Sequence, residues 1–351
     1  MLYATQNPHG GDIYTHPVRL DFSANINPLG TPEAVFQAVK DSLPLLHRYP
    51  DPSCRELVQA ISDFEVLPEE TILCGSGAAE LIFSYCRAVQ PKKALLLAPT
   101  FCEYENALRT VGCGVEHFFL EENRGFAPTE AFLSCLEITD AELLMLCNPN
   151  NPTGLPLEPS LLRKICELCR NRGIRLFVDE CFLDLTENGK QLSLTGSLSQ
   201  YPNVLLLKAF TKSYGMAGLR LGYCLSADRA LLAAMSRQTQ PWNISIPAQK
   251  AGVAALKETA FLEAARGIIH TQRPRLLKAL TDLGLRPIPS KTNFILFYSQ
   301  RELYAPLLEK GIQLRKCDNY LGLGPGWYRI AVKREEENDA LLSALEEVLY
   351  G

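Results

Sequence analysis

Short apolar runs alternate with stretches of helical spacing through the first two thirds of the chain. Runs such as KALLLAP (93–99), AELLMLC (141–147) and NVLLLKAF (203–210) hold few polar positions, which is typical of strands buried on both faces. Between them, stretches such as AAELIFSYCRAV (78–89) and PSLLRKICELCRNRG (159–173) place apolar residues three and four positions apart, as an amphipathic helix does. The alternation predicts an α/β fold with a mostly parallel sheet between layers of helices.

The pattern changes near residue 245. A long stretch of helical spacing covers residues 248–280, and two short strands (292–298 and 327–332) and a final helix (335–350) follow it. This order predicts a smaller α+β domain. We therefore expect an N-terminal arm that packs with the small domain, a large domain and a small C-terminal domain. Their predicted bounds are 1–30, 31–245 and 246–351.

Composition and charge indicate an ordinary cytoplasmic protein. The 351 residues are 47% hydrophobic, and the net charge of −4 comes from interspersed acids and bases, which argues against a nucleic-acid partner. The sequence shows no signal-peptide pattern and no apolar run of the ~20 residues that a membrane helix needs. Its twelve cysteines are scattered, so we expect free thiols. Cys166 and Cys169 form a lone CxxC inside a predicted helix, so we expect no metal.

Four motifs stand where predicted strands end. GSGAAE (75–80) offers backbone N–H groups at the start of a helix, which suits a phosphate, although GxGxxE is a poor match to a dinucleotide loop. Phe101 of PTFCEY could stack on a flat ring, and Asn151 of the NPTG turn could donate an amide hydrogen bond. Asp179 is a strand-end carboxylate that needs a partner if buried. Singly, each motif is explained as well by a turn, a cap or a core aromatic.

A fifth motif, KAFTKSYGMAGLR (208–220), places two lysines and an arginine around a turn of small residues. It is either a solvated loop at a strand end or the site of a lysine that bonds covalently to a ligand. Taken in order, the five motifs resemble those of the class I/II aminotransferase superfamily, from about residue 20 to the C-terminus. The resemblance implies the pyridoxal-phosphate fold type I, with pyridoxal 5'-phosphate as cofactor and a large cofactor-binding domain.

The resemblance also implies roles for single residues. The covalent lysine of the family stands eight residues before the arginine, which selects Lys212, and Asp179 would pair with the ring nitrogen. Lys208 stands where relatives carry arginine, so it is a second phosphate contact or a structural cation. Tyr49 would reach the cofactor phosphate of a neighbouring subunit, which implies a homodimer with shared active sites. The other implied cofactor contacts are Ser76, Gly77, Ala78, Phe101, Asn151, Phe182, Thr211 and Arg220.

Three further stretches, HGGDIY (9–14), LDFSANINPLG (20–30) and LRKCDNYLGLG (314–324), are similar to the threonine-phosphate decarboxylases, which supply aminopropanol phosphate for cobalamin biosynthesis. They are similar, less closely, to the histidinol-phosphate aminotransferases. The resemblance implies a small phosphorylated amino acid as substrate, with Arg329 as the carboxylate clamp. The implied substrate-binding residues are His9, Asn27, Arg315 and Arg329, with Asn25 as a further candidate.

Two features bear on the reaction. Phe182 replaces the tyrosine that transaminases of this group usually carry, which favours decarboxylation. Only THPVR (15–19) separates the first two stretches, whereas the family has a longer insert there. This shortens the arm that should cover the substrate phosphate, so phosphoserine also remains open as a substrate. A histidinol-phosphate-type aminotransferase is the main alternative, and a non-catalytic pyridoxal-phosphate regulator is a third.

Overall fold

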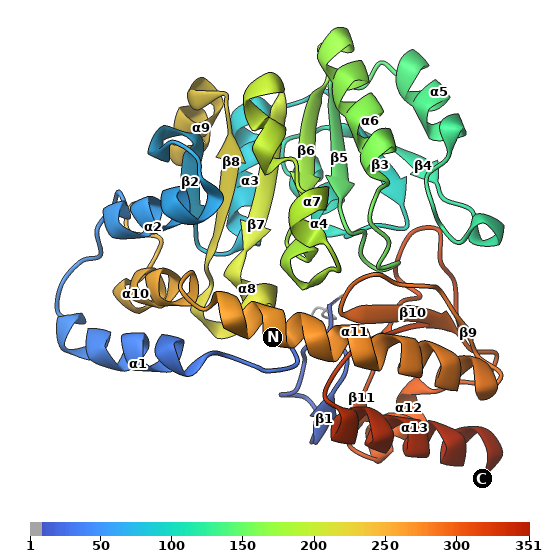
Figure 1. Ribbon diagram of the computed structural model, residues 1–351. Helices are drawn as coiled ribbons and strands as arrows, with labels where there is room; N and C mark the ends of the chain where they lie inside the picture. The colour runs from blue at the N-terminus through green and yellow to red at the C-terminus, as the bar shows by residue number, and fades with distance from the viewer. Residues whose placement is uncertain (1–8) are drawn as a thin grey trace.

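A seven-stranded sheet forms the centre of the larger part of the molecule (Figure 1). In spatial order its strands are β2 (Ile72–Gly75), β8 (Gly222–Ser226), β7 (Val204–Ala209), β6 (Arg175–Asp179), β5 (Leu143–Cys147), β3 (Lys93–Ala98) and β4 (Gly114–Phe119). Within this sheet β8 alone runs against the other strands, because it pairs antiparallel with both β2 and β7. The computed structural model describes residues 9–351, so the first eight residues of the predicted arm lie outside the described part.

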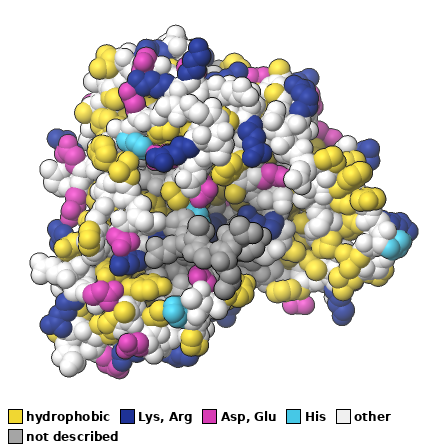
Figure 2. Space-filling model, turned by 180° about the vertical axis from the view of Figure 1, so that it is seen from behind, with side chains coloured by type: hydrophobic (Ala, Val, Ile, Leu, Met, Phe, Trp, Pro, Cys, Tyr) yellow, Lys and Arg dark blue, Asp and Glu magenta, His cyan; other side chains and the backbone are white. Residues whose placement is uncertain are grey.

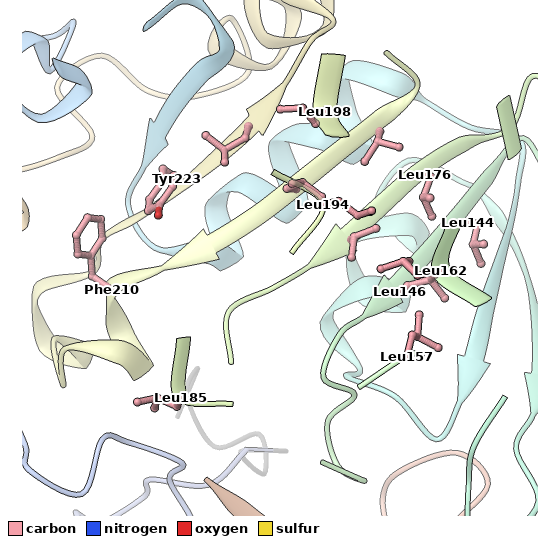
Figure 3. Packing of buried hydrophobic residues seen from close by; sticks show 14 of the residues in the cluster. Leu144, Leu146, Leu157, Leu162, Leu176, Leu185, Leu194, Leu198, Phe210 and Tyr223 are labelled. Atoms are coloured by element: carbon pink, nitrogen blue, oxygen red, sulfur yellow. The ribbon is translucent and has the colours of Figure 1, made fainter. Parts of the chain in front are cut away.

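Helices cover both faces of this sheet. The helices of this part are α1 (Glu33–Ser42), α2 (Arg55–Glu65), α3 (Ala78–Val89), α4 (Glu103–Arg109), α5 (Glu130–Ile138), α6 (Pro159–Arg172), α7 (Gly189–Leu192), α8 (Phe210–Ser213), α9 (Arg229–Ser236) and α10 (Ile246–Ala255). Alternate residues of β5 enter two different hydrophobic clusters: Leu144 and Leu146 pack on the α6 side, and Leu143 and Met145 on the α3 side. Figure 3 shows Leu144, Leu146 and Leu162 in the first cluster. This two-sided burial is the reason that the strand sequences are apolar throughout.

A second, four-stranded antiparallel sheet carries the C-terminal part. Its order is β12 (Arg315–Lys316), β13 (Trp327–Ala331), β10 (Phe294–Tyr298) and β9 (Arg286–Pro287), and its helices are α11 (Thr259–Asp282), α12 (Tyr304–Glu309) and α13 (Glu335–Tyr350). Beside it β1 (Leu20–Asp21) pairs in parallel with β11 (Ile312–Gln313). Phe22 lies fully buried in the hydrophobic cluster of this sheet. The chain segment after residue 20 therefore packs with the C-terminal part.

Single-turn and short 3-10 helices lie in the connections. They are η1 (Leu43–Leu45), η2 (Glu69–Thr71), η3 (Glu122–Arg124), η4 (Leu183–Leu185), η5 (Thr195–Gln200) and η6 (Ala217–Leu219). All twelve cysteines are free, as the sequence predicts. No helix within residues 9–351 is both long and apolar enough to cross a bilayer. On the face shown in Figure 2, acidic and basic side chains are intermingled.

The long stretch of helical spacing over 248–280 is interrupted in the structure. The structure has two helices there, α10 and α11, separated by Leu256–Glu258. α10 packs on α1 and α2, whereas α11 crosses from one part of the molecule to the other. Leu262 and Ile269 of α11 lie in a large-sheet cluster, while Leu276 and Leu280 lie in the small-sheet cluster. Apolar spacing continues through the break because it does not report a change of direction. The domain bounds at 30 and 245 stay a prediction.

Candidate active site

A cavity of about 440 Å³ lies where the carboxyl ends of β5, β6 and β7 face the small sheet. Most of the predicted site residues meet there, although they come from distant parts of the sequence. The predicted residues that line it are His9, Ala78, Phe101, Asn151, Asp179, Phe182, Thr211, Lys212, Arg220, Arg315 and Arg329. Ser76, Gly77, Asn27 and Tyr49 do not line it.

Lys212 lies on α8, the single helical turn that directly follows β7. Hydrogen bonds hold this turn from two sides. Asn27 donates its backbone N–H to the carbonyl oxygen of Lys212 (3.1 Å) and its side-chain Nδ2 to that of Ser213 (2.7 Å). The Ser213 hydroxyl donates to Asp184 Oδ2 (2.8 Å). Desolvation lowers the pKa of Lys212 to about 8, and the nearby Arg329 and Arg220 act in the same direction. The turn therefore presents an amine that loses its proton unusually easily, as a nucleophilic lysine must.

Asp179 ends β6 as a buried carboxylate. Its Oδ2 accepts a hydrogen bond from the Tyr104 hydroxyl (2.7 Å), and its Oδ1 accepts one from the Cys181 backbone N–H (2.9 Å). Burial raises the pKa of Asp179 despite these bonds. A cationic partner in the cavity would stabilise the charged form. Tyr104 was not predicted, and its only signal in the sequence is that a tyrosine buried in a helix needs a hydrogen-bond partner.

Only part of the glycine-rich turn, the predicted phosphate cradle, faces the cavity. Gly77 has a φ of +84°, and a Cβ there would lie 2.7 Å from Nη2 of Arg220, so glycine is what lets this guanidinium approach the turn. Ala78 and Thr211 line the cavity beside it. Ser76 does not, and its backbone N–H donates to Glu80 Oε2 (2.6 Å). The structure thus satisfies the Ser76 amide within the chain, which the motif alone could not show.

Aromatic rings form part of the cavity wall. Phe101 lies between His9, whose ring centroid is 5.7 Å away, and Tyr104, which meets it edge-on at 5.6 Å. Phe182 packs edge-on against Phe294, with ring centroids 4.9 Å apart. Because Phe182 has no hydroxyl, it contributes shape to the cavity and no hydrogen bond.

Two buried arginines lie opposite each other on neighbouring strands of the small sheet. Arg315 and Arg329 are directly opposite residues of the antiparallel pair β12–β13, and they are 8% and 6% exposed. Arg329 donates from Nη2 to the Ser23 carbonyl oxygen (2.8 Å) and from Nη1 to Asn151 Oδ1. Arg315 donates from Nη2 to Asn319 Oδ1 (2.7 Å). Like charges directly opposite on neighbouring strands are destabilising, and burial adds to the cost. An anionic ligand between them would relieve both.

The two asparagines of the N-terminal segment have different surroundings. Asn27 is buried, and its Nδ2 and Oδ1 are used by Ser213 and Leu29, so it supports the Lys212 turn and does not face the cavity. Asn25 is 1% exposed and lines the cavity, and neither its Nδ2 nor its Oδ1 has a hydrogen-bond partner among residues 9–351. A buried amide without partners is costly, which points to a ligand. The predicted contact of Asn27 with the substrate stays a prediction, and these contacts favour Asn25.

His9 lies at the cavity, where its Nε2 is 2.8 Å from Glu103 Oε1. This hydrogen bond lowers the pKa of Glu103. Within the described residues, the His9, Cys102 and Glu103 side chains also lie close enough together to share a cation. We interpret the His9–Glu103 contact as an ordinary hydrogen-bonded pair at the cavity wall.

Tyr49 is 77% exposed and stacks on Trp242, with ring centroids 4.6 Å apart. It lies outside the cavity of its own chain. Its contact with a neighbouring subunit stays a prediction.

Lys208 is buried between acidic side chains and does not line the cavity. Its Nζ lies 3.0 Å from Glu65 Oε1 and 3.6 Å from Glu180 Oε2. Tyr223, which Figure 3 shows beside Phe210, donates its hydroxyl to the same Glu65 oxygen (2.6 Å). Burial alone would lower the pKa of Lys208, but the carboxylates outweigh it and raise that pKa well above its usual value. Of the two roles left open by the sequence, the contacts support the structural cation.

Comparison with known proteins establishes the relationship that the motifs suggest. The sequence matches the family Aminotransferase class I and II over residues 18–345. The chain belongs to this family. Its architecture is accordingly that of the fold-type-I pyridoxal-phosphate transferases, with one strand reversed in a mostly parallel sheet and a small antiparallel sheet beside it.

Relatives of this chain carry more than one enzyme name. The threonine-phosphate decarboxylase of Salmonella typhimurium is 38% identical over 336 residues, which cover 95% of this chain and 92% of the relative. A histidinol-phosphate aminotransferase of Methanosarcina mazei is 30% identical over 334 residues, or 93% and 87% of the two chains. The crystal structure of histidinol-phosphate aminotransferase from Clostridium acetobutylicum is similar with a TM-score of 0.88 at 29% identity, covering 94% of this chain and 99% of that one.

Pyridoxal 5'-phosphate is the cofactor of this family, and the cavity fits it. Gly77 leaves room for the Arg220 guanidinium at the predicted phosphate cradle. Asp179 is a buried carboxylate suited to a protonated ring nitrogen, and Lys212 is an amine with a lowered pKa. Asn151 lines the cavity, and while its Oδ1 accepts from Arg329, an amide Nδ2 is the kind of donor that a ring oxygen needs.

Proposed function

We propose that the protein is a pyridoxal-phosphate-dependent decarboxylase of L-threonine O-3-phosphate that produces (R)-1-aminopropan-2-yl phosphate for cobalamin biosynthesis. The family membership and the 38% identical decarboxylase support this choice. The observation that carries it is the pair of buried arginines, Arg315 and Arg329, placed opposite each other at the cavity. Two guanidinium groups suit a substrate with two acidic groups, and O-phosphothreonine has a phosphate and a carboxylate.

The remaining cavity residues fit the same substrate. In this proposal Arg329 binds the carboxylate, while Arg315, His9 and Asn25 bind the phosphate. Asn25 supports this arrangement because its buried amide is without a partner among residues 9–351. The substrate would thus be held at both ends, with its Cα next to Lys212.

Decarboxylation breaks the bond between Cα and the carboxylate and needs a proton at Cα afterwards. The bound cofactor serves as the electron sink for the electrons of that bond. Arg329 would bind the substrate carboxylate and set its orientation at the cavity. Lys212 would deliver the proton to Cα from Nζ, which its lowered pKa favours near neutral pH.

We also propose a cytoplasmic homodimer in which the active sites are shared. Exposed apolar side chains lie along α1, η1 and the segments that follow, which suits a protein contact. They are Phe36, Leu43, Leu46 and Tyr49, and the exposed Trp242, from the segment before α10, stacks on Tyr49. Twelve free thiols suit a reducing compartment. Mixing the variants Tyr49→Ala and Lys212→Ala should restore activity if Tyr49 completes the site of the partner subunit. Activity no higher than that of either variant alone would count against shared sites.

A CO₂-release assay tests the function. The purified holoenzyme should release one CO₂ for each O-phosphothreonine consumed and should form the aminopropanol phosphate, without any 2-oxo acid. Phosphoserine serves as the second substrate, because it differs by one methyl group and tests the alternative decarboxylase. Release of CO₂ from neither compound would overturn the proposal.

A histidinol-phosphate-type aminotransferase is the second candidate, since relatives with that name are 30% identical. Histidinol phosphate has no carboxylate for Arg329, although the 2-oxoglutarate that accepts its amino group has two. Formation of glutamate from histidinol phosphate and 2-oxoglutarate, with no CO₂ from O-phosphothreonine, would establish this reaction in place of decarboxylation.

A further inference from the structure

Tyr320 touches both of the arginines that face each other at the cavity, and it lines the cavity itself. It is buried in the turn between β12 and β13, where its backbone N–H donates to the Cys317 carbonyl oxygen (3.1 Å). Tyr320 therefore belongs to the connection that joins the two strands carrying the arginines.

The two ends of Tyr320 make different contacts. The guanidinium carbon of Arg315 lies 5.3 Å from the centre of the tyrosine ring, within the range of a cation–π interaction. At the other end, Arg329 donates from Nη1 to the Tyr320 hydroxyl (3.3 Å), and this hydroxyl donates to Asn151 Oδ1 (3.3 Å). Burial raises the pKa of Tyr320, so the hydroxyl stays protonated and can donate.

We propose that Tyr320 is a positioning residue that directs the two arginines to two different groups of the substrate. Its ring orients Arg315 toward the substrate phosphate, and its hydroxyl orients Arg329 toward the carboxylate. This inference rests on the proposed substrate having both groups.

The physical reason is the register of the two strands. Arginines directly opposite each other repel, and without a spacer both guanidinium groups could turn to the same anion. The negative face of the ring attracts Arg315, while the hydroxyl oxygen at the ring edge accepts from Arg329. The Tyr320 side chain thus keeps the two guanidinium groups apart and orients each of them differently. Since the hydroxyl also contacts Asn151, it helps to fix which end of that amide faces the cofactor.

Two variants separate the two ends of the side chain. Tyr320→Phe removes the hydroxyl and keeps the ring, and Tyr320→Leu removes both. Tyr328→Phe is the matched control: Tyr328 is the neighbour of Arg329 on β13, is also buried, and accepts from the Leu303 backbone N–H in the small-sheet cluster. Thermal unfolding of the three holoenzyme variants shows whether any loss is merely structural.

Binding is measured by calorimetry on the holoenzyme with two probes. L-Threonine carries the carboxylate without the phosphate, and O-phosphoethanolamine carries the phosphate without the carboxylate. Tyr320→Phe should weaken L-threonine binding roughly tenfold, the size of one hydrogen bond to a charged group, and should change O-phosphoethanolamine binding by less than about twofold. Tyr320→Leu should weaken both probes, and Tyr328→Phe should weaken neither.

Equal losses for both probes in Tyr320→Phe, or no loss for L-threonine, would overturn the assignment. So would unchanged O-phosphoethanolamine binding in a folded Tyr320→Leu protein, or a wild-type protein that binds neither probe. If Tyr320→Leu does not fold, the contrast between the probes in Tyr320→Phe decides. Neither probe needs decarboxylation, so failure of the CO₂ assay with the wild-type enzyme would remove the proposed function and leave the test of Tyr320 intact.

Discussion

Lys208 and Lys212 stand four residues apart, and their surroundings are opposite in charge. Lys208 lies on β7 between the carboxylates of Glu65 and Glu180, which raise its pKa well above the usual value against the effect of burial. Lys212 lies one helical turn beyond the strand, where desolvation and the charge of Arg329 lower its pKa to about 8. The same side chain is thus a permanent cation at one position and a reactive amine at the other. The two pKa values differ because the neighbouring groups differ, since the side chains are chemically identical and lie close together in the sequence.

The largest effect should come from removing the amine at Lys212. Lys212→Met should abolish covalent retention of the cofactor and should lower CO₂ release by more than about a thousandfold, since it removes a nucleophile. Retention is measured by reduction with borohydride followed by mass spectrometry. Lys208→Arg is the control and should keep the covalent cofactor. Borohydride-trapped cofactor on Lys208 in the Lys212→Met variant would reverse the roles of the two lysines.

Removing the charge at Lys208 should instead affect stability. Lys208→Met leaves the two carboxylates of Glu65 and Glu180 buried without their cation, which should lower the free energy of unfolding by about 3–5 kcal/mol. Urea unfolding of the apoenzyme measures this. The double variant Lys208→Met/Glu65→Gln should recover part of the loss, and Lys212→Met should cost little because it removes a desolvated amine. A Lys208→Met protein as stable as the wild type would show that the ion pairs of Lys208 with the two carboxylates contribute nothing to stability.

The support of the Lys212 turn can be separated from substrate binding through the two asparagines. Asn27→Ala should lower the free energy of unfolding by about 1–3 kcal/mol, because the Ser213 carbonyl oxygen and the Leu29 N–H lose their partner. Asn25→Ala should keep the stability and should raise KM for O-phosphothreonine roughly tenfold. Steady-state kinetics of both variants measures KM, and urea unfolding of both measures the free energy of unfolding. If Asn27→Ala raised KM without loss of stability, Asn27 would bind the substrate and the preference for Asn25 would be wrong.

The smallest effect concerns the pH at which Lys212 reacts. Cofactor capture by the apoenzyme should increase as the pH rises through about 8, because the lysine must lose its proton before it can bond. The folded-state pKa is lowered, so the reactive form appears at a lower pH than for an ordinary lysine. Arg329→Gln removes a charge that lowers this pKa and should move the midpoint upward. Absorbance-monitored capture between pH 6.5 and 9.5, the range of roughly 1.5 units on each side of that value, measures both midpoints. An unchanged midpoint in Arg329→Gln would show that Arg329 does not influence Lys212.

Much of this site can be predicted from sequence because each motif follows a strand and parallel strands end at one edge of a sheet. That reasoning brings Asn151, Asp179 and Lys212 together correctly. It does not distinguish Asn25 from Asn27, because the two differ only in which way the backbone turns them. It also cannot find Tyr320, whose role depends on the register of β12 and β13.

The fold shows the same division. The apolar runs identify the strands β3, β5, β6 and β7, since burial on both faces leaves a strong pattern. The reversed direction of β8 leaves no such pattern. Only residues 210–221 connect β7 to β8, and they form α8 and η6, which contain Lys212 and the turn before Arg220. The segment that carries the lysine therefore also joins two antiparallel strands.

The pairing of β1 with β11 has a consequence for synthesis of the protein. Leu20 pairs with Ile312 and Asp21 with Gln313, so these contacts join residues almost the whole chain apart. A ribosome releases the N-terminal segment first, and that segment has no strand to pair with until residue 313 has emerged. Arg315 and Arg329 emerge still later. A nascent chain therefore contains Lys212 well before the residues that form the substrate side of its cavity have been made.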